Sequence, residues 1–174
     1  MVILIRQASY IILVINTMSR VNMIVAYIVI VILGVGLYFG GRYLPYPYLK
    51  AILPCKDSMF ESLKLIIYPS LIYMVIDLFI IRRNVNGAFS SYITGIIVAI
   101  VFKLTSYYTL YGIIGDVIPY IEYIIYGIAI GIILYYRNKK ITLLNSLSSV
   151  IVLLILVIML AVFSYFPSSL SIFS

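Results

Sequence analysis

Charged side chains placed in or beside apolar stretches are the residues of this sequence that could do chemistry. Six of them form the candidate binding site, called the charged cluster below: Asp57, Glu61, Lys64, Lys103, Asp116 and Glu122. The first three follow i, i+4, i+7 spacing and therefore share one face of a helix. Acids and amines gathered away from bulk water could bind a polar ligand, line a hydrated vestibule or hold helices together as ion pairs.

The composition limits other kinds of site. The chain has no histidine and a single cysteine, Cys55, which excludes a Cys/His zinc site and a disulfide within one chain. We expect no metal, no cofactor and no set of catalytic residues. A serine beside a lysine, as in Ser58 with Lys64 or Ser106 with Lys103, could form a nucleophile pair, but such pairs are unspecific.

The same composition predicts an all-α integral membrane protein. Hydrophobic residues make up 65% of the chain, charged residues 10%, and the mean hydropathy is +1.22, which leaves too little polar surface for a water-soluble domain. The net charge of +7 comes from basic residues at the ends of apolar runs, as is typical of topology signals. The expected partner is therefore the lipid bilayer, and no nucleic acid is expected.

Five apolar stretches must position the charged cluster, each about 20 residues long, the length that crosses a bilayer as a helix. The expected spans are residues 22–39, 61–81, 88–107, 117–136 and 147–166. They form a bundle of five transmembrane helices in a single domain, residues 21–174. Residues 1–20 are expected as a short N-terminal interfacial segment, within which Met18 is an alternative start to Met1.

Turn and helix-breaking residues predict the connections between these spans. Three prolines predict an irregular interfacial loop over residues 40–57. Ser58 and Glu61 form a capping-box pattern at the start of the second span, and Pro69 predicts a kink inside it. Asn86-Gly87 predicts a tight turn into the third span, so that these two helices form a hairpin.

Small residues at helical spacing predict where helices approach closely. The expected packing positions are Ser91, Gly95, Ala99, Gly127 and Gly131. Lys103 continues the first three of these at the same spacing of four, so it should point into the bundle and need a partner. Gly131 lies about 180° around its helix from Glu122, so the glycine and acidic faces should meet different neighbours.

Basic residues at the span ends predict the orientation. Seven fall on one side: Arg6, Arg20, Arg82, Arg83, Arg137, Lys139 and Lys140. Four fall on the other: Arg42, Lys50, Lys56 and Lys64. The positive-inside rule then places the protein in the cell membrane with its N terminus in the cytoplasm and its C terminus outside. The charged cluster gathers on the outer side, together with a Tyr/Gly-rich link over residues 108–115.

Structural roles compete with binding at each charged position. Asp57 and Glu61 would stabilise a helix N terminus whether or not a ligand is present. Lys103 could extend to the headgroups. Pairing with Glu122 is the alternative, because inserting each separate charge into hydrocarbon costs roughly 2.5–3.5 kcal/mol on insertion scales. Asp77 is expected to pair locally with the arginines that follow it.

The segment from Asp57 to Pro69 resembles the signature of an uncharacterised family of small multi-span bacterial membrane proteins, a domain-of-unknown-function family common in low-GC Gram-positive bacteria. Its pattern is approximately Asn-Glu-Ser-x-Trp-Glu-His-x-Lys before the second span. Asp77 and the segment 107–115 are similar to later family elements. The resemblance covers most of the chain from the first span onward, and it implies the fold and the membrane location but no reaction.

Four positions of the motif depart from the family pattern. Lys56 replaces asparagine, Asp57 replaces glutamate, Phe60 replaces tryptophan and Ser62 replaces histidine. An activity that depended on the histidine would be absent here or would rest on Glu61 and Lys64, the two matching residues that the resemblance carries over.

Three functions remain open from the sequence. The first is a non-enzymatic membrane or envelope accessory or assembly component, in which the charges fix packing or contact a membrane protein partner. The second is a small transporter or ion-conducting subunit with an outward-facing charged vestibule, which would need a homo-oligomer because five spans are few. The third is an intramembrane enzyme, which the absence of histidine and of a recognisable nucleophile motif disfavours.

Overall fold

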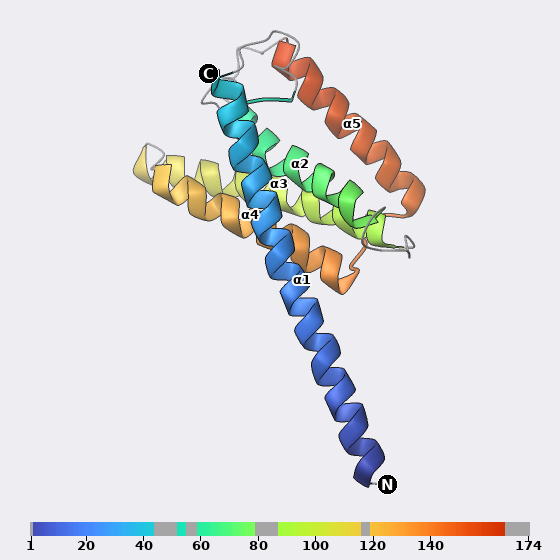
Figure 1. Cartoon of the computed structure of the whole chain (residues 1–174). Helices are drawn as coiled ribbons and strands as arrows, with labels where there is room; N and C mark the ends of the chain where they lie inside the picture. Colours follow the sequence, from blue (N-terminus) through green and yellow to red (C-terminus); the bar gives the residue numbers. More distant parts are fainter. Residues whose placement is uncertain (1, 44–51, 55–58, 79–86, 116–118, 166–174) are drawn as a thin grey trace.

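The described residues form five α-helices and no β-strand (Figure 1). This computed structural model describes residues 2–43, 52–54, 59–78, 87–115 and 119–165, and it describes side chains of the first helix from Asn22 onward. The helices are α1 (Val2–Tyr43), α2 (Met59–Ile76), α3 (Ala88–Ile114), α4 (Pro119–Lys139) and α5 (Ser146–Tyr165). The expected all-α class and helix number are therefore present.

Each helix contains a segment long and apolar enough to cross a membrane. These segments are Asn22–Tyr43, Met59–Ile76, Ala88–Ile114, Tyr120–Lys139 and Ser146–Tyr165. α5 is the most apolar, yet only 11% of its segment is buried, against 56% for α2 and for α3. Large apolar side chains are exposed along α1 and α5, where a water-soluble protein would present polar groups.

The third helix is longer than the sequence suggested. The link expected over residues 108–115 is helical up to Ile114, and the helix ends where Gly115 adopts φ +78° and donates its N–H to the Tyr111 carbonyl. Gly112 alone weakens a helix by only about 1 kcal/mol, and no proline stops it. Tyr107 and Tyr111, one turn apart, stack with ring centroids 6.3 Å apart.

The first helix runs without a break through the boundary expected between residues 20 and 21. The interfacial placement of residues 1–20 stays a prediction. At the other end, a side chain on Gly41 would collide with the Pro54 carbonyl, and one on Gly40 would touch Leu53. The glycines thus let residues 53 and 54 fold back onto the end of α1, while residues 44–51 of the expected loop lie outside the described part.

The second helix continues through Pro69 and ends in a π-helical turn at Asp77 and Leu78. Ser58, the proposed cap, lies outside the described residues. The next described residue, Gly87, has φ +79°, a left-handed conformation that glycine adopts without steric cost. This agrees with the tight turn expected before α3.

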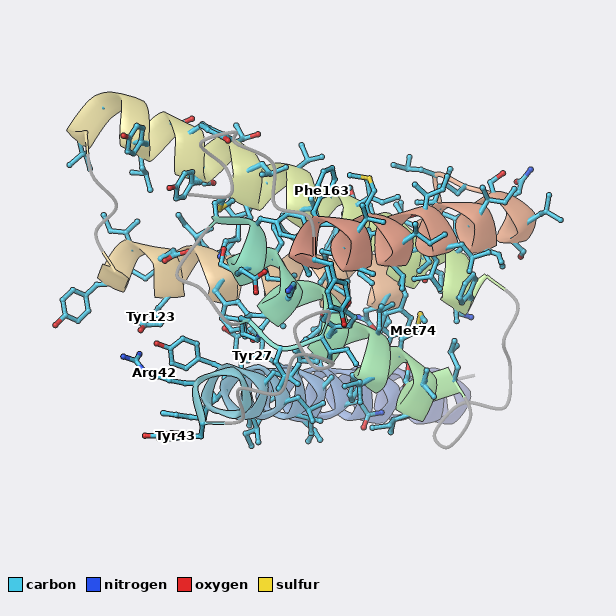
Figure 2. The ribbon with its side chains drawn as sticks, turned by 90° about the horizontal axis from the view of Figure 1, so that it is seen from above. Tyr27, Arg42, Tyr43, Met74, Tyr123 and Phe163 are labelled. Carbon is cyan, nitrogen blue, oxygen red and sulfur yellow. The ribbon has the colours of Figure 1, made fainter. Side chains whose placement is uncertain are left out.

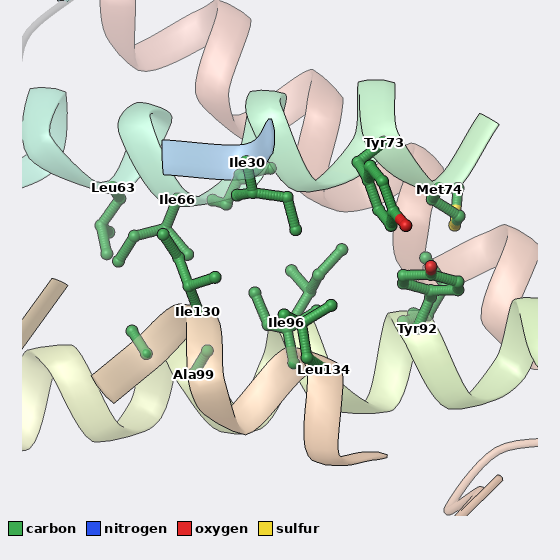
Figure 3. Packing of buried hydrophobic residues seen from close by; sticks show 14 of the residues in the cluster. Ile30, Leu63, Ile66, Tyr73, Met74, Tyr92, Ile96, Ala99, Ile130 and Leu134 are labelled. Carbon is green, nitrogen blue, oxygen red and sulfur yellow. The ribbon is translucent and has the colours of Figure 1, made fainter. Parts of the chain in front are cut away.

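The core lies where α2 faces α3 and α4. Figure 3 shows Leu63, Ile66 and Tyr73 of α2 opposite side chains of α3 and α4, with Ile30 of α1 beside them. α3 and α4 run side by side, α1 crosses the bundle, and α5 packs along α3 (Figures 1 and 2). Phe163 of α5 also meets Phe60 of α2 edge to face, with centroids 5.7 Å apart.

The small-residue stripe of α3 packs closely against α4. Ser91, Gly95 and Ala99 are all buried. A methyl group on Gly95 would lie 3.0 Å from Ile133 Cα and 3.1 Å from its carbonyl oxygen, so the backbones of α3 and α4 approach directly at this position. The structure thus places Ser91, Gly95 and Ala99 in the interior of the bundle, with Gly95 against α4.

The two glycines of α4 behave differently from each other. A methyl group on Gly127 would lie 2.7 Å from the Tyr27 hydroxyl of α1, so this position does serve helix packing. Gly131 is exposed and has no described atom within 4 Å of where its Cβ would be. No described part of this chain packs against Gly131, which lies about half a turn around α4 from Ile133, the residue that meets α3.

Replacing Gly95 with alanine should destabilise the protein by about 1–3 kcal/mol, since the added methyl must push α3 away from the α4 backbone. The matched change Gly131→Ala should be neutral or stabilising by up to ~1 kcal/mol, because alanine favours helix and the site is open. Unfolding of both variants in mixed micelles measures the difference. Equal stability of the two variants would contradict the close approach at Gly95.

Candidate functional site

The described members of the charged cluster lie at one end of the bundle. Glu61 and Lys64 are in the first turns of α2, Glu122 is in the first turn of α4, and Lys103 is in the second half of α3. α2 and α4 both run opposite to α3, so these three segments come to the same end. Asp57 and Asp116 lie outside the described residues.

Glu61 and Lys64 pair with each other within α2. Lys64 Nζ lies 2.8 Å from Oε1 and 2.9 Å from Oε2 of Glu61. The lysine side chain is fully buried and the glutamate side chain is 11% exposed. An amine at this depth needs the carboxylate, because neutralising the charge locally avoids most of the cost of burying it.

Lys103 and Glu122 join α3 to α4. Lys103 Nζ donates to Glu122 Oε1 at 3.3 Å, and the lysine side chain is 4% exposed while the glutamate side chain is 34% exposed. The pairing expected from the sequence is therefore present, and Lys103 does point into the bundle. The contact is longer than that of Glu61 with Lys64, and one partner remains accessible.

The shortest of the described ion pairs lies at the opposite end of the bundle, outside the charged cluster. Arg137 at the end of α4 donates from Nη2 to Asp77 Oδ1 at 2.6 Å and from Nε to Oδ2 at 3.0 Å. The two parallel hydrogen bonds match the planar guanidinium to the carboxylate. The Asp77 side chain is fully buried and the Arg137 side chain is 2% exposed.

Two tyrosines contact this ion pair. The Tyr92 hydroxyl of α3 donates to Asp77 Oδ2 at 2.8 Å. The Arg137 guanidinium lies 5.9 Å from the ring centroid of Tyr73, within the range of a cation–π contact. We call Tyr73, Asp77, Tyr92 and Arg137 the arginine network; it ties the ends of α2 and α4 to the start of α3.

The sequence patterns do not reveal this network. They mark Arg137 as a topology signal and predict that Asp77 pairs with Arg82 and Arg83, which lie outside the described residues. The observed partner is 60 positions away along the chain. The expected topology contains a clue to this partner, because the second and fourth spans end on the same side of an antiparallel bundle.

Hydroxyl groups fix the α4–α5 connection at this same end. The Ser90 hydroxyl donates to the Leu144 carbonyl at 2.8 Å, and its oxygen lies 2.7 Å from Ser149 Oγ in α5. The Leu143 N–H donates to Thr94 Oγ1 at 3.2 Å. The start of α3 therefore holds the connection through side chains, so this end is ordered by polar contacts from four helices.

An apolar layer separates the two polar ends. It consists of side chains that are at most 2% exposed: Ile66, Ile96, Ala99, Ile130 and Ile133. Figure 3 shows most of this layer between α2, α3 and α4. Because these side chains have no polar atoms, they interrupt the polar groups between the charged cluster and the arginine network.

Comparisons with protein-family models, curated proteins and solved structures gave no match. The family resemblance of residues 57–69 therefore stays a prediction. Within the described ranges, no group of three His, Cys, Asp or Glu side chains is placed to hold a metal ion.

Removing one partner of the Asp77–Arg137 pair should cost about 3–5 kcal/mol of unfolding free energy, because a buried charge is left without compensation. Asp77→Leu and Arg137→Leu should each show this loss, and the double variant should be less destabilised than either single variant. Arg42→Leu is the control, since Arg42 is exposed and bonds only to Tyr38 of its own helix among the contacts described. Additive losses in the double variant would show that the two residues act independently.

Proposed function

We propose that this chain is an integral membrane protein with five spans that acts as a non-enzymatic accessory or assembly component of the cell membrane or envelope. Its N terminus faces the cytoplasm and its C terminus faces outside. In this role the buried charges are structural, because they hold the helices in one arrangement that a membrane protein partner or a second copy can contact.

The observation that carries this proposal is the pairing of interior charges. Every buried charged side chain in the described part of the chain has an oppositely charged partner within 3.3 Å. The apolar layer between the two polar ends supports the same conclusion, since a conduction path needs continuous polar or hydrated surroundings. Glu61 and Lys64, the residues carried over from the family resemblance, form one of these pairs.

A membrane location is supported by the outer surface as well as by helix length. Exposed apolar residues follow one another along α5, for example Leu154, Ile155, Ile158 and Val162. Burying such a surface in lipid removes it from water at a gain of about 25 cal/mol per Å². The exposed basic residues Lys139 and Lys140 sit beyond the apolar part of α4, where headgroups would meet them.

The alternative of a small transporter is favoured by one observation, the partial exposure of Glu122. The Glu122 side chain is 34% exposed, and its contact with Lys103 is 3.3 Å long. Of the described ion pairs, this is the one that water would reach most easily. In that case the Lys103–Glu122 pair would open into an outward vestibule.

Thiol labelling distinguishes the two functions. In a Cys55→Ser background, Lys103→Cys should react with a membrane-impermeant reagent on intact cells more than about tenfold slower than Arg42→Cys, because reaching it requires an opening that costs above ~1.4 kcal/mol. Glu122→Cys should react at an intermediate rate. Fast labelling at both positions would instead support an aqueous vestibule and the transporter alternative.

The same labelling tests the orientation. Arg42 and Lys140 are exposed at opposite ends of the bundle, so Arg42→Cys should label on intact cells and Lys140→Cys only after permeabilisation. The reverse pattern would invert the topology while leaving the packing argument intact.

A further inference from the structure

The Tyr126 hydroxyl of α4 is a buried polar group without a described hydrogen-bond partner. Its oxygen is closed off from solvent where α4 meets α1. Leaving a buried hydroxyl without a partner costs about 1–3 kcal/mol, so native structures satisfy nearly all such groups. The surroundings of this hydroxyl therefore indicate what satisfies it.

The carbonyl of Leu65 in α2 is a matching acceptor. In a regular helix this carbonyl would accept the N–H of the residue four positions later, which is Pro69. Proline has no N–H, so Pro69 leaves the Leu65 carbonyl without its helical donor. Its lone pairs are available to a donor from outside the helix.

Both oxygens border Gly34 of α1. A methyl group on Gly34 would collide with the Tyr126 hydroxyl and would lie 3.5 Å from the Leu65 carbonyl oxygen. The missing side chain of Gly34 thus leaves a corner, bounded by α1, α2 and α4, in which the two polar atoms are neighbours. We call this corner the Gly34 notch.

A second tyrosine holds the same helix pair in register. Tyr27 of α1 places its hydroxyl against Gly127 of α4, where an added methyl would lie 2.7 Å away. Each helix therefore inserts a tyrosine against a glycine of the other, Tyr27 against Gly127 and Tyr126 against Gly34. This reciprocal packing keeps the Tyr126 hydroxyl in the notch.

We propose that the Gly34 notch is a binding site for one buried water molecule, which links the Tyr126 hydroxyl to the Leu65 carbonyl. The hydroxyl makes no direct hydrogen bond, so the link needs a molecule that bonds to both oxygens, and water is the smallest that can. The two oxygens supply two of the two to four partners that a buried water takes. The site joins α4 to the point of α2 where Pro69 removes one helical hydrogen bond, and it does not depend on the proposed function.

A double-mutant cycle tests the link in the full-length protein in lipid nanodiscs. Tyr126→Phe should lower the apparent Tm by roughly 2–4 °C, because the carbonyl loses its partner. In a Pro69→Ala background, alanine supplies the helical N–H, and the same change should shift Tm by less than about 1 °C. Equal shifts in both backgrounds would overturn the proposal. Tyr123→Phe is the matched control, since Tyr123 is 68% exposed on the same helix.

A second cycle tests the position of the hydroxyl. Gly34→Ala should lower Tm in the wild-type background and should be better tolerated beside Tyr126→Phe, which removes the atom that the methyl meets. Gly36→Ala, where nothing lies within 4 Å, should have little effect in either background. If Tyr126→Phe gives Gly34→Ala no relief, the hydroxyl is not in the notch and the proposal fails.

A high-resolution density map of the protein in the same nanodiscs tests whether a water molecule occupies the site. The expected result is one density peak within hydrogen-bond distance of both oxygens. Direct contact between the hydroxyl and the carbonyl, or an empty notch, would overturn the water site.

Discussion

The buried pair of Asp77 with Arg137 is the constraint on which the arrangement of the helices depends. Separating these two charges inside the bundle would leave each without compensation, and that cost exceeds what most single apolar contacts contribute. The two hydrogen bonds also fix direction, because a planar guanidinium meets a carboxylate side by side only in a narrow set of orientations. The end of α2 must therefore stay beside the end of α4, and Tyr92 adds the start of α3 to the same point.

Close packing and polar contacts together hold the remaining helices in place. In the lipid environment proposed above, apolar side chains gain little by meeting one another, so close packing and hydrogen bonds decide which helices associate. The contact of Gly95 with Ile133 supplies the first, and the ion pairs at both ends supply the second. α5 has few of either: Ser149 and Phe163 make its described polar and aromatic contacts, Leu160 is buried in the core, and only 11% of its apolar segment is buried.

The sequence was sufficient to predict helix number, approximate span positions, the packing stripe of α3 and the partner of Lys103, because each depends on local composition or on one periodicity. It failed where the answer depended on distant segments. The partner of Asp77 requires knowing that α2 and α4 end together, and the exposure of Gly131 requires knowing which face of α4 meets α3. The length of α3 was missed for another reason: glycine and tyrosine between residues 108 and 115 suggest a break, although a single internal glycine is tolerated.

The pairing of the charges also limits what a ligand could do here. A substrate that entered the bundle would have to open an ion pair, and it would then need to supply a charge of the same sign as the one it displaced, or the site would hold an uncompensated charge. The arginine network cannot meet this requirement easily, because Arg137 and Tyr92 both donate to the one buried carboxylate of Asp77. The Lys103–Glu122 pair can, since its carboxylate is 34% exposed and the lysine is the only buried charge of the pair. Any ligand of this bundle should therefore be an anion that competes with Glu122 for Lys103, while the opposite end keeps the helices in place.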